Sequence, residues 1–315
     1  MTKVPTKSDI ELAHRRIKDH IHKTPILTSS SINKIFQAKL YFKCENFQRA
    51  GAFKMRGATN AILSLSKNEL EKGVATHSSG NHAGALALAA QSLDINSYIA
   101  MPSTAPDIKK KAVEGYGGKI TFCKPTQDDR EKTLNEIVKK TGATFIHSYD
   151  DCRIIAGQAT CAKEIFEELG ETDYLLAPLG GGGLLSGSSL SAKYFSNFTK
   201  VIGVEPKGAD DAYRSIRDGK IYASIEPKTI ADGLLTSLSV KTYNIIKDNV
   251  SEIITVEEET ILKAMYLIWE RMKIIIEPSS ATVLAAVMEN QGRFHNKSLA
   301  LILSGGNVDI KKLQR

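Results

Sequence analysis

Short apolar runs alternate with helix-length segments along most of this chain of 315 residues. The runs have the length of buried strands, and they are Leu40–Cys44, Ser97–Met101, Ile120–Cys123, Ala143–Ile146, Tyr174–Pro178, Val201–Val204 and Leu299–Leu303. The segments between them that predict helices are Asn81–Ser92, Asp107–Tyr116, Asp128–Lys140 and Gly157–Leu169. Because parallel strands need helical crossovers that cover the sheet, this alternation predicts an open α/β sandwich.

A further amphipathic helix is expected near the amino terminus. Ser8 and Glu11 have the spacing of a capping box, and the apolar residues that follow would form the buried face. These apolar residues are Leu12, Ile17 and Ile21.

The composition excludes several classes of protein. Hydrophobic residues make up 42% and charged residues 24% of the chain, which is ordinary for a soluble globular protein. The net charge of +7 comes from scattered lysines without a long basic tract, so we interpret it as a solubility feature, with a small allowance for anionic substrates, and expect no nucleic-acid polymer as a partner. No apolar run approaches the roughly 18 residues of a membrane span. We therefore expect a soluble protein without a membrane partner.

The cysteines indicate a reducing compartment. Cys44, Cys123, Cys152 and Cys161 lack the CxxC and Cys/His spacings of metal sites, and no secretory apolar segment opens the chain. A cytoplasmic location is the resulting expectation.

Lys54 stands at a predicted strand-to-helix junction. It lies next to the aromatic Phe53 and just past the turn-forming Gly51, soon after the run Leu40–Cys44. Such a position can lower the pKa of an amine and free its lone pair for attack on a carbonyl. A lysine that opens a helix is more often solvated, so this segment alone leaves both interpretations open.

Four consecutive glycines follow the apolar run Leu175–Leu179 and precede an expected helix opening at Leu184; they are Gly180, Gly181, Gly182 and Gly183. Residues without side chains let backbone N–H groups approach an anion, and a helix amino terminus adds a favourable dipole. The Gly-Lys-Ser/Thr of a P-loop and the Gly-x-Gly-x-x-Gly of a dinucleotide site are both absent. The segment predicts a phosphate cradle, with a flexible turn as the alternative.

Two further loops of small polar residues follow apolar runs. The loop Ser78–His82 gathers hydroxyl, amide and N–H groups at a helix start, which suits a bound carboxylate as well as a plain N-cap. The loop Ser304–Asn307 offers a hydroxyl for a heterocyclic nitrogen, or simply forms a turn. All four features lie at the carboxyl ends of predicted strands, where open α/β sheets place their ligands.

Together these segments resemble the fold-type II family of pyridoxal phosphate (PLP) enzymes, and within it the branch of serine racemases and serine/threonine dehydratases. The resemblance covers nearly the whole chain, and the ordered set makes it specific. The matching segments are Lys23–Ser30, Gly51–Lys54, Ser78–His82, Ala156–Gln158, Gly180–Gly183, Thr229–Gly233, Glu277–Pro278 and Ser304–Asp309.

The resemblance implies a fold like that of the tryptophan synthase β subunit, with two open, twisted, parallel-rich sheets covered by helices. A large PLP-binding domain would comprise residues 1–72 and 150–315, and a small domain residues 73–149. A C-terminal regulatory domain is not expected, because the chain ends soon after Asn307. A homodimer is implied, and ATP is an effector in some members of the family.

The same resemblance implies the cofactor contacts. Lys54 would bind PLP covalently, and Phe53 would flank the pyridine ring. Asn81 would bond the ring hydroxyl, while the amides of the four glycines and of Leu184 would hold the phosphate. Ser304 would contact the pyridine nitrogen. A hydroxyl, unlike a carboxylate, does not keep that nitrogen protonated, which favours elimination of a β-substituent.

Two opposed groups would handle the α-proton of the substrate. Lys54 would remove it as a general base, and Ser79 would return a proton from the opposite face. Simple serine and threonine dehydratases commonly carry alanine at the position of Ser79, so this serine indicates racemase capability. Loss of a β-hydroxyl before reprotonation would instead yield a 2-oxo acid and ammonia.

Substrate binding by resemblance centres on the loop before the Asn81 helix. The residues implied, with two further candidates at the end, are Ser78, Ser79, Asn81, His82, Arg130 and Ser237. An exposed helix charge pair explains Arg130 equally well.

The segment Glu205–Asp211 resembles the divalent-cation loop of the family. Glu205, the Ala209 carbonyl and Asp211 would be the ligands, and oxygen-only ligation suits Mg²⁺ or Ca²⁺. Without the resemblance, a solvated acidic turn would explain the same residues. The ion would be structural or activating, since the chemistry belongs to PLP.

The sequence therefore indicates a PLP-dependent serine racemase with accompanying L-serine and L-threonine dehydratase activity. The nearest alternative is a dedicated dehydratase for L-threonine, L-serine or threo-3-hydroxyaspartate. A non-catalytic PLP or amino-acid binding protein is a further alternative, against which the presence of both Lys54 and Ser79 argues.

Overall fold

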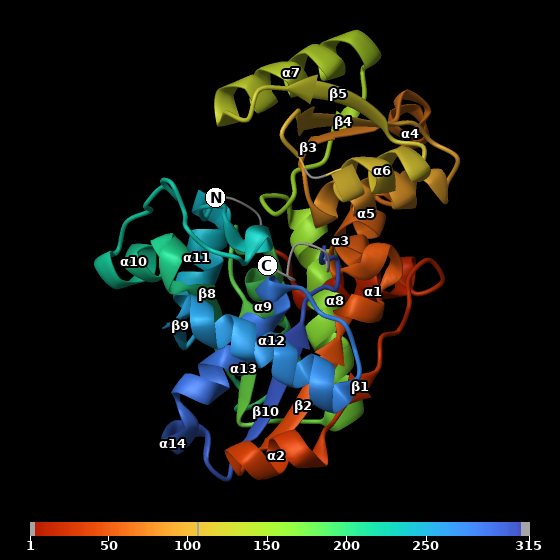
Figure 1. The fold of residues 1–315 in the computed structure, drawn as a ribbon. Helices are drawn as coiled ribbons and strands as arrows, with labels where there is room; N and C mark the ends of the chain where they lie inside the picture. Colours follow the sequence, from red (N-terminus) through yellow and green to blue (C-terminus); the bar gives the residue numbers. More distant parts are fainter. Residues whose placement is uncertain (1–3, 106, 310–315) are drawn as a thin grey trace.

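The computed structural model describes residues 4–105 and 107–309, which form two sheets flanked by helices (Figure 1). The larger sheet has six strands in the order β1-β2-β10-β7-β8-β9. β1 pairs antiparallel with β2, and all other neighbours are parallel. The strands are β1 (Ile26–Leu27), β2 (Lys39–Cys44), β7 (Tyr174–Pro178), β8 (Lys200–Pro206), β9 (Glu252–Val256) and β10 (Ser298–Leu303).

The smaller sheet has four parallel strands in the order β5-β4-β3-β6. The strands are β3 (Val74–His77), β4 (Ser97–Pro102), β5 (Lys119–Cys123) and β6 (Thr144–Phe145). This sheet lies at the top of Figure 1, with helix α7 on one face and helices α5 and α6 on the other. The three helices are α5 (Asn81–Gln91), α6 (Asp107–Gly115) and α7 (Gln127–Thr141). The division into domains at residues 73–149 stays a prediction.

The remaining helices cover the larger sheet or connect the two sheets. They are α1 (Lys7–Ile17), α2 (Ser30–Phe36), α3 (Lys54–Ile62), α4 (Lys67–Lys72), α8 (Cys152–Leu169), α9 (Gly183–Phe195), α10 (Asp211–Asp218), α11 (Val240–Asn249), α12 (Glu258–Met272), α13 (Pro278–Glu289) and α14 (Gln291–Phe294). Single 3₁₀ turns are η1 (Glu45–Phe47), η2 (Arg49–Gly51), η3 (Lys207–Ala209) and η4 (Asp232–Leu234).

Both faces of the larger sheet are buried, which explains why its central strands are continuous apolar runs. In β10, Leu299, Leu301 and Leu303 join a core cluster with α12 and α13. Ala300 and Ile302 alternate with them and join a second cluster with α8 and α9 on the opposite face. The alternating fold predicted from the sequence is confirmed, with helices on both faces of a mostly parallel sheet.

The local predictions hold with specific exceptions. Every apolar run predicted as a strand contains one, and the four predicted helices are present. α8 begins at Cys152, before the predicted Gly157, because the Asp151 side chain caps it by accepting the Arg153 N–H. Strands β1 and β9 were not predicted.

The first helix corrects one prediction. Thr6, and not Ser8, is the N-cap of α1, because its hydroxyl accepts the Asp9 N–H and the Asp9 carboxylate accepts the Thr6 N–H. The buried face of α1 also differs from the predicted one, since it consists of Ile10, Ala13 and Ile17. Leu12 is 44% exposed, and Ile21 lies beyond the end of α1.

Two observations bear on the cellular setting. The four cysteines are free thiols. Within residues 4–105 and 107–309, no helix is long and apolar enough to cross a membrane.

Candidate active site

The four loops singled out in the sequence follow the carboxyl ends of β2, β3, β7 and β10. Three of these strands, β2, β10 and β7, are neighbours, so their loops share one edge of the larger sheet. The Phe53 N–H donates to the Ser304 carbonyl at 3.0 Å, and Ala52 forms an isolated bridge with Gly305. These contacts place Lys54, the first residue of α3, beside the Ser304 loop.

Lys54 is half-buried, and its amine contacts a backbone carbonyl and an aromatic ring. Its Nζ donates to the Ser148 carbonyl at 2.9 Å and lies 5.1 Å from the centroid of the Phe53 ring. Burial lowers the pKa of Lys54 to about 8, because loss of hydration disfavours the ammonium form. At pH 7 roughly one such amine in ten is neutral, against roughly one in three thousand for an ordinary lysine. The site therefore provides an amine prepared for nucleophilic and base chemistry.

The glycine loop, residues Gly180–Gly183, has no room for side chains because neighbouring residues pack closely around it. A Cβ on Gly181 would lie 2.4 Å from the Tyr149 ring, and one on Gly183 would lie 2.9 Å from the Tyr149 Cβ. Gly182 has a φ of +87°, and a Cβ there would meet Leu238 at 2.8 Å. α9 begins at Gly183, and no side chain caps its first N–H groups. An uncapped helix terminus behind a loop without side chains fits an anion such as a phosphate.

Asn81 is the first residue of α5. It forms hydrogen bonds with Glu277, the N-cap of α13, and with Asn307, in the loop after β10. Its Nδ2 donates to Glu277 Oε1 at 2.8 Å, and its Oδ1 accepts from Asn307 Nδ2 at 3.0 Å. Burial raises the pKa of Glu277 to about 7, and the Asp232 carboxylate adds to the rise. Asn81 thus links the helix that follows β3 to the loop after β10.

The loop before α5 carries two hydroxyls and a buried imidazole. The Ser78 hydroxyl accepts a backbone N–H of its own loop at 3.3 Å, and Ser79 is half-buried. His82 is 2% exposed, and its Nε2 donates to the Ile146 carbonyl at 3.3 Å. Burial, with the Lys54 ammonium as the second cause, lowers the pKa of His82 to about 3. The neutral ring then has Nδ1 as an acceptor and no N–H for a carboxylate, so a substrate role for His82 stays a prediction.

The other predicted residues are Arg130, whose charge acts on His77 at the end of β3, and Ser237 and Leu184. Arg130 lies on α7, on the outer face of the smaller sheet, and its Nε has no hydrogen-bond partner in the described part of the chain. Ser237 accepts the Ser224 N–H at 2.7 Å and precedes Leu238, which borders the glycine loop. Leu184 is buried in the first turn of α9. The roles of these residues in binding also stay predictions.

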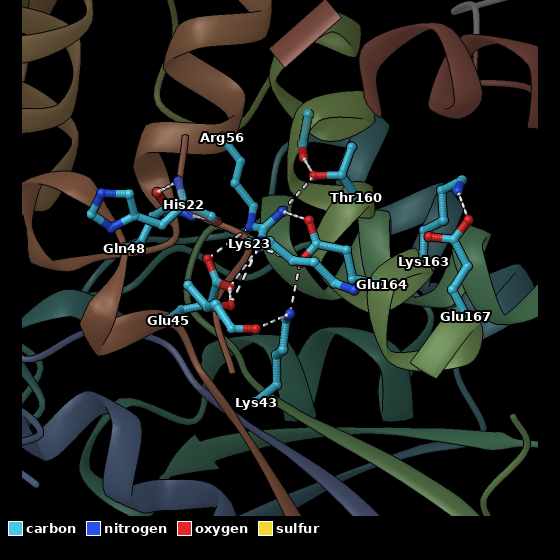
Figure 2. Close-up of polar contacts among 12 residues, drawn as sticks. His22, Lys23, Lys43, Glu45, Gln48, Arg56, Thr160, Lys163, Glu164 and Glu167 are labelled. Carbon is cyan, nitrogen blue, oxygen red and sulfur yellow. Dashed lines mark hydrogen bonds and ion pairs between the residues drawn. The ribbon is translucent and has the colours of Figure 1, made fainter. Parts of the chain in front are cut away.

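A buried charge cluster joins the first turn of α3 to β2, η1 and α8 (Figure 2). It consists of Lys43, Glu45, Arg56 and Glu164, and none of these side chains is more than 3% exposed. Arg56 meets Glu45 through Nε and Nη2, both at 2.8 Å. It meets Glu164 through Nη1 at 2.7 Å and Nη2 at 2.8 Å, and Thr160 accepts from Nη1 at 3.1 Å. All five N–H groups of the guanidinium therefore have acceptors.

The buried charge cluster fixes the helix that begins at Lys54. The N-cap of α3, Phe53, provides no side-chain hydrogen bond, so the terminus depends on other contacts. Arg56 ties this first turn to η1 through Glu45 and to α8 through Glu164. The cluster contains two positive and two negative groups, so their charges balance. The lowered pKa of Lys54 comes from burial and not from these charges. The cluster positions the amine without adding a net charge beside it.

The sequence around Arg56 carries a signal for this cluster, although it belongs to none of the motifs described above. Arg56 precedes the stretch Gly57–Ala61, whose small residues predict close packing on all sides of the helix. A charged residue in such a stretch is almost never buried unpaired, so carboxylate partners should have been expected. Glu164 lies 108 residues away in the chain, and no local pattern identifies it.

Two buried carboxylates occupy the predicted cation loop. Glu205 is 1% exposed and accepts the N–H groups of Ala212 and Tyr213 at 3.1 and 2.8 Å. Burial raises the pKa of Glu205 and of Asp211 above their ordinary values. Neither carboxylate oxygen of Asp211 has a hydrogen-bond partner in the described part of the chain. Ala209 lies between Glu205 and Asp211 in the sequence and is buried in η3.

Side chains alone do not form a metal site, either in this loop or elsewhere in the part of the chain that the structure describes. In the described ranges, no group of three or more His, Cys, Asp or Glu side chains is arranged to hold a metal ion. A cation here would depend on the Ala209 carbonyl and water in addition to the two carboxylates.

The chemistry of the edge where these loops meet fits PLP. The uncapped terminus of α9 suits its phosphate, and the buried Lys54 amine suits its aldehyde. The buried Ser304 hydroxyl and the Asn81 amide are neutral groups of the kind that can bond a pyridine nitrogen and a ring hydroxyl.

Comparison with known proteins identifies the family. The family model described as pyridoxal-phosphate dependent enzyme matches residues 17–305. A beta-hydroxyaspartate dehydratase of Paracoccus denitrificans is 49% identical over 98% of this chain and 98% of its own. The serine racemase of Dictyostelium discoideum is 47% identical over 98% of this chain and 97% of its own. The structure of maize serine racemase matches with a TM-score of 0.96 at 40% identity, covering 99% of this chain and 96% of its own. The chain belongs to the family of pyridoxal-phosphate dependent enzymes.

Proposed function

We propose that this protein is a serine racemase that interconverts L- and D-serine and also dehydrates L-serine and L-threonine. The observation that carries the proposal is the buried Lys54 amine, whose pKa of about 8 suits a base that works near neutral pH. Ser79 supports it as the second proton-carrying group. Relatives named as racemases and as dehydratases have similar identity to this chain, so both reactions agree with the family.

In the proposed reaction, different residues transfer the protons, orient the substrate and hold the phosphate. When bound, PLP supplies an electron sink for the negative charge that develops at the substrate Cα. Lys54 Nζ takes the α-proton on one face, and Ser79 Oγ supplies a proton on the other, which inverts the configuration. Ser78 and Asn81 orient the carboxylate, and the glycine loop holds the phosphate through its N–H groups.

Dehydration uses the same first step. If the β-hydroxyl leaves before Ser79 delivers a proton, hydrolysis of the product gives a 2-oxo acid and ammonia. The balance between the two outcomes is set by how quickly the opposite face is reprotonated.

A dedicated dehydratase for 3-hydroxyaspartate is the second candidate, and the Paracoccus relative favours it. Its substrate carries a second carboxylate, which needs a basic partner. Arg130 is one candidate, because its Nε is buried without a hydrogen-bond partner in the part of the chain that the structure describes.

Replacing Ser79 with alanine tests the racemase assignment. We expect racemisation of L-serine to fall by about a hundredfold or more, because no group then returns the proton, while elimination is partly retained. Chiral chromatography and a 2-oxo acid assay measure the two rates. Ser78→Ala is the matched control, and it should raise KM for both reactions alike. Equal loss of both reactions in Ser79→Ala would remove its assigned role.

The lowered pKa of Lys54 predicts how PLP capture by the cofactor-free protein depends on pH. Below about 8 the amine is mostly protonated and cannot attack, so the capture rate should rise about tenfold per pH unit and level off above 8. His82 and His147 do not contribute above pH 6, because burial lowers their pKa values to about 3 and about 4. Stopped-flow absorbance measures the rate, and a flat profile between pH 6 and 9 would contradict the buried-amine account.

We also propose a Mg²⁺ or Ca²⁺ site at Glu205, the Ala209 carbonyl and Asp211, supported by the unpartnered Asp211 carboxylate. A saturated site should raise the melting temperature by about 5 °C, and chelation should abolish this gain. Asp211→Asn should melt at the lower temperature with or without chelator. Asp210→Asn is the matched control, since Asp210 pairs with Arg214. Indifference of the wild type to chelation and to added cation would refute the site.

A cytoplasmic homodimer with ATP as an effector completes the proposal. The family resemblance supports the homodimer and the ATP effector, and the cysteine spacings support the cytoplasmic location. Sedimentation with and without ATP would establish the subunit number and whether the nucleotide alters it.

A further inference from the structure

Ser280 is buried next to Ser304, in the first turn of α13. Ser280 is 0% exposed and Ser304 is 3% exposed, and their Oγ atoms lie 3.1 Å apart. In the described part of the chain, Ser280 is the one hydrogen-bond partner of the Ser304 hydroxyl.

The proton of each hydroxyl can be assigned from the neighbouring distances. Ser280 Oγ lies 2.7 Å from the Gly305 nitrogen and 2.7 Å from the Gly305 carbonyl oxygen. The Gly305 N–H occupies one acceptor position of this oxygen. The Ser280 proton goes to the carbonyl, because 2.7 Å is the favoured O–H···O distance and 3.1 Å is long. The second acceptor position then faces Ser304, whose own proton is directed at Ser280.

The geometry points to Ser280 as a positioning residue that competes with the pyridine nitrogen of PLP for the Ser304 proton. This inference rests on the proposed function, in which Ser304 contacts that nitrogen. Ser304 can donate to the nitrogen only by giving up its hydrogen bond to Ser280. The nitrogen therefore receives a weaker hydrogen bond than a serine without this neighbour would give.

The strength of that bond affects the course of the reaction. Electron withdrawal at the pyridine nitrogen spreads the negative charge that develops at the substrate Cα. A weak donor leaves more charge at Cα, which promotes early departure of the β-hydroxyl over return of a proton. Ser280 therefore shifts the partition from racemisation towards elimination.

The test is the nitrogen-15 NMR signal of PLP labelled at its pyridine nitrogen, bound to the wild type and to Ser280→Ala. Without the competitor Ser304 donates more strongly, so the signal should move upfield. The ratio of D-serine to 2-oxo acid should rise by roughly fivefold, the equivalent of about one hydrogen bond. A signal that does not move, or that moves downfield, overturns the inference. A wild type that binds no labelled PLP overturns the proposed function instead.

Two further variants guard against an indirect effect through the Gly305 loop. Ser280→Cys has nearly the same size but a weaker acceptor, so the signal should move in the same direction by less, even if Ser280→Ala fails to fold. Ser279→Ala is the matched control, because Ser279 accepts the Gly233 N–H at 3.0 Å and has no hydrogen bond to the Ser304 hydroxyl in the described part of the chain. Its signal should coincide with that of the wild type, and a shift equal to that of Ser280→Ala overturns the proposal.

Discussion

Replacing Lys54 with alanine should abolish both racemisation and dehydration, with kcat lower by at least about a thousandfold. In the proposed function, the variant loses both the amine that takes the α-proton and the group to which PLP attaches. The PLP absorbance band of the purified protein should disappear as well. Absorbance spectra and initial rates with L-serine measure the two losses.

The control for this variant is a lysine that also opens a helix but is solvated. Lys67 begins α4 and is exposed. Lys67→Ala should retain the spectrum and the rates of the wild type. A Lys54→Ala variant that still turns over L-serine at a comparable rate would refute the assignment of Lys54.

Replacing Arg56 with methionine should lower the free energy of unfolding by about 3 to 5 kcal/mol. The change leaves Glu45 and Glu164 buried, with Lys43 as the remaining cation of the buried charge cluster. Burial alone would raise the pKa of Glu164, but Arg56 and Lys43 hold it below its ordinary value. Urea unfolding of the cofactor-free protein, followed by circular dichroism, measures the loss.

Two controls show whether the loss of stability comes from the bidentate ion pairs of Arg56. Arg56→Lys should recover little of the loss, because an ammonium cannot form two bidentate pairs. Lys263→Met breaks an exposed pair with Glu259 on α12 and should leave the free energy of unfolding almost unchanged, because water screens the pair. A loss in Arg56→Met no larger than that in Lys263→Met would contradict the role assigned to the buried charge cluster.

The parts of the fold that the sequence predicted are those with a local signal. β7 and β10 are apolar on both faces and stand out as runs. β1 has only two residues, and β9 combines apolar residues with Glu252 and Thr255, so neither has such a pattern. Their positions depend on pairing with β2 and β8.

In the candidate site, too, only the features with a local sequence signal were predicted. Lys54, the glycine loop and Ser304 follow predicted strands, and the rule that ligands lie at the carboxyl ends of parallel strands grouped them correctly. The contact between Asn81 and Glu277 joins residues 196 positions apart, and only the tertiary fold reveals it. Ser280 is one of several small residues in a buried helix, and its distances to Gly305 and Ser304 distinguish it from the others.

In the proposed function, the Ser79 hydroxyl separates a racemase from a dehydratase. Family membership does not decide it, because relatives with either name match nearly the whole chain. The geometry of the loop before α5 is compatible with both reactions.

Incubation of the PLP-loaded protein with L-serine, followed by measurement of D-serine and 2-oxo acid in the same sample, tests this assignment most directly. We expect the wild type to form both products and Ser79→Ala to form the 2-oxo acid with little D-serine. Formation of the 2-oxo acid by the wild type without D-serine would contradict it.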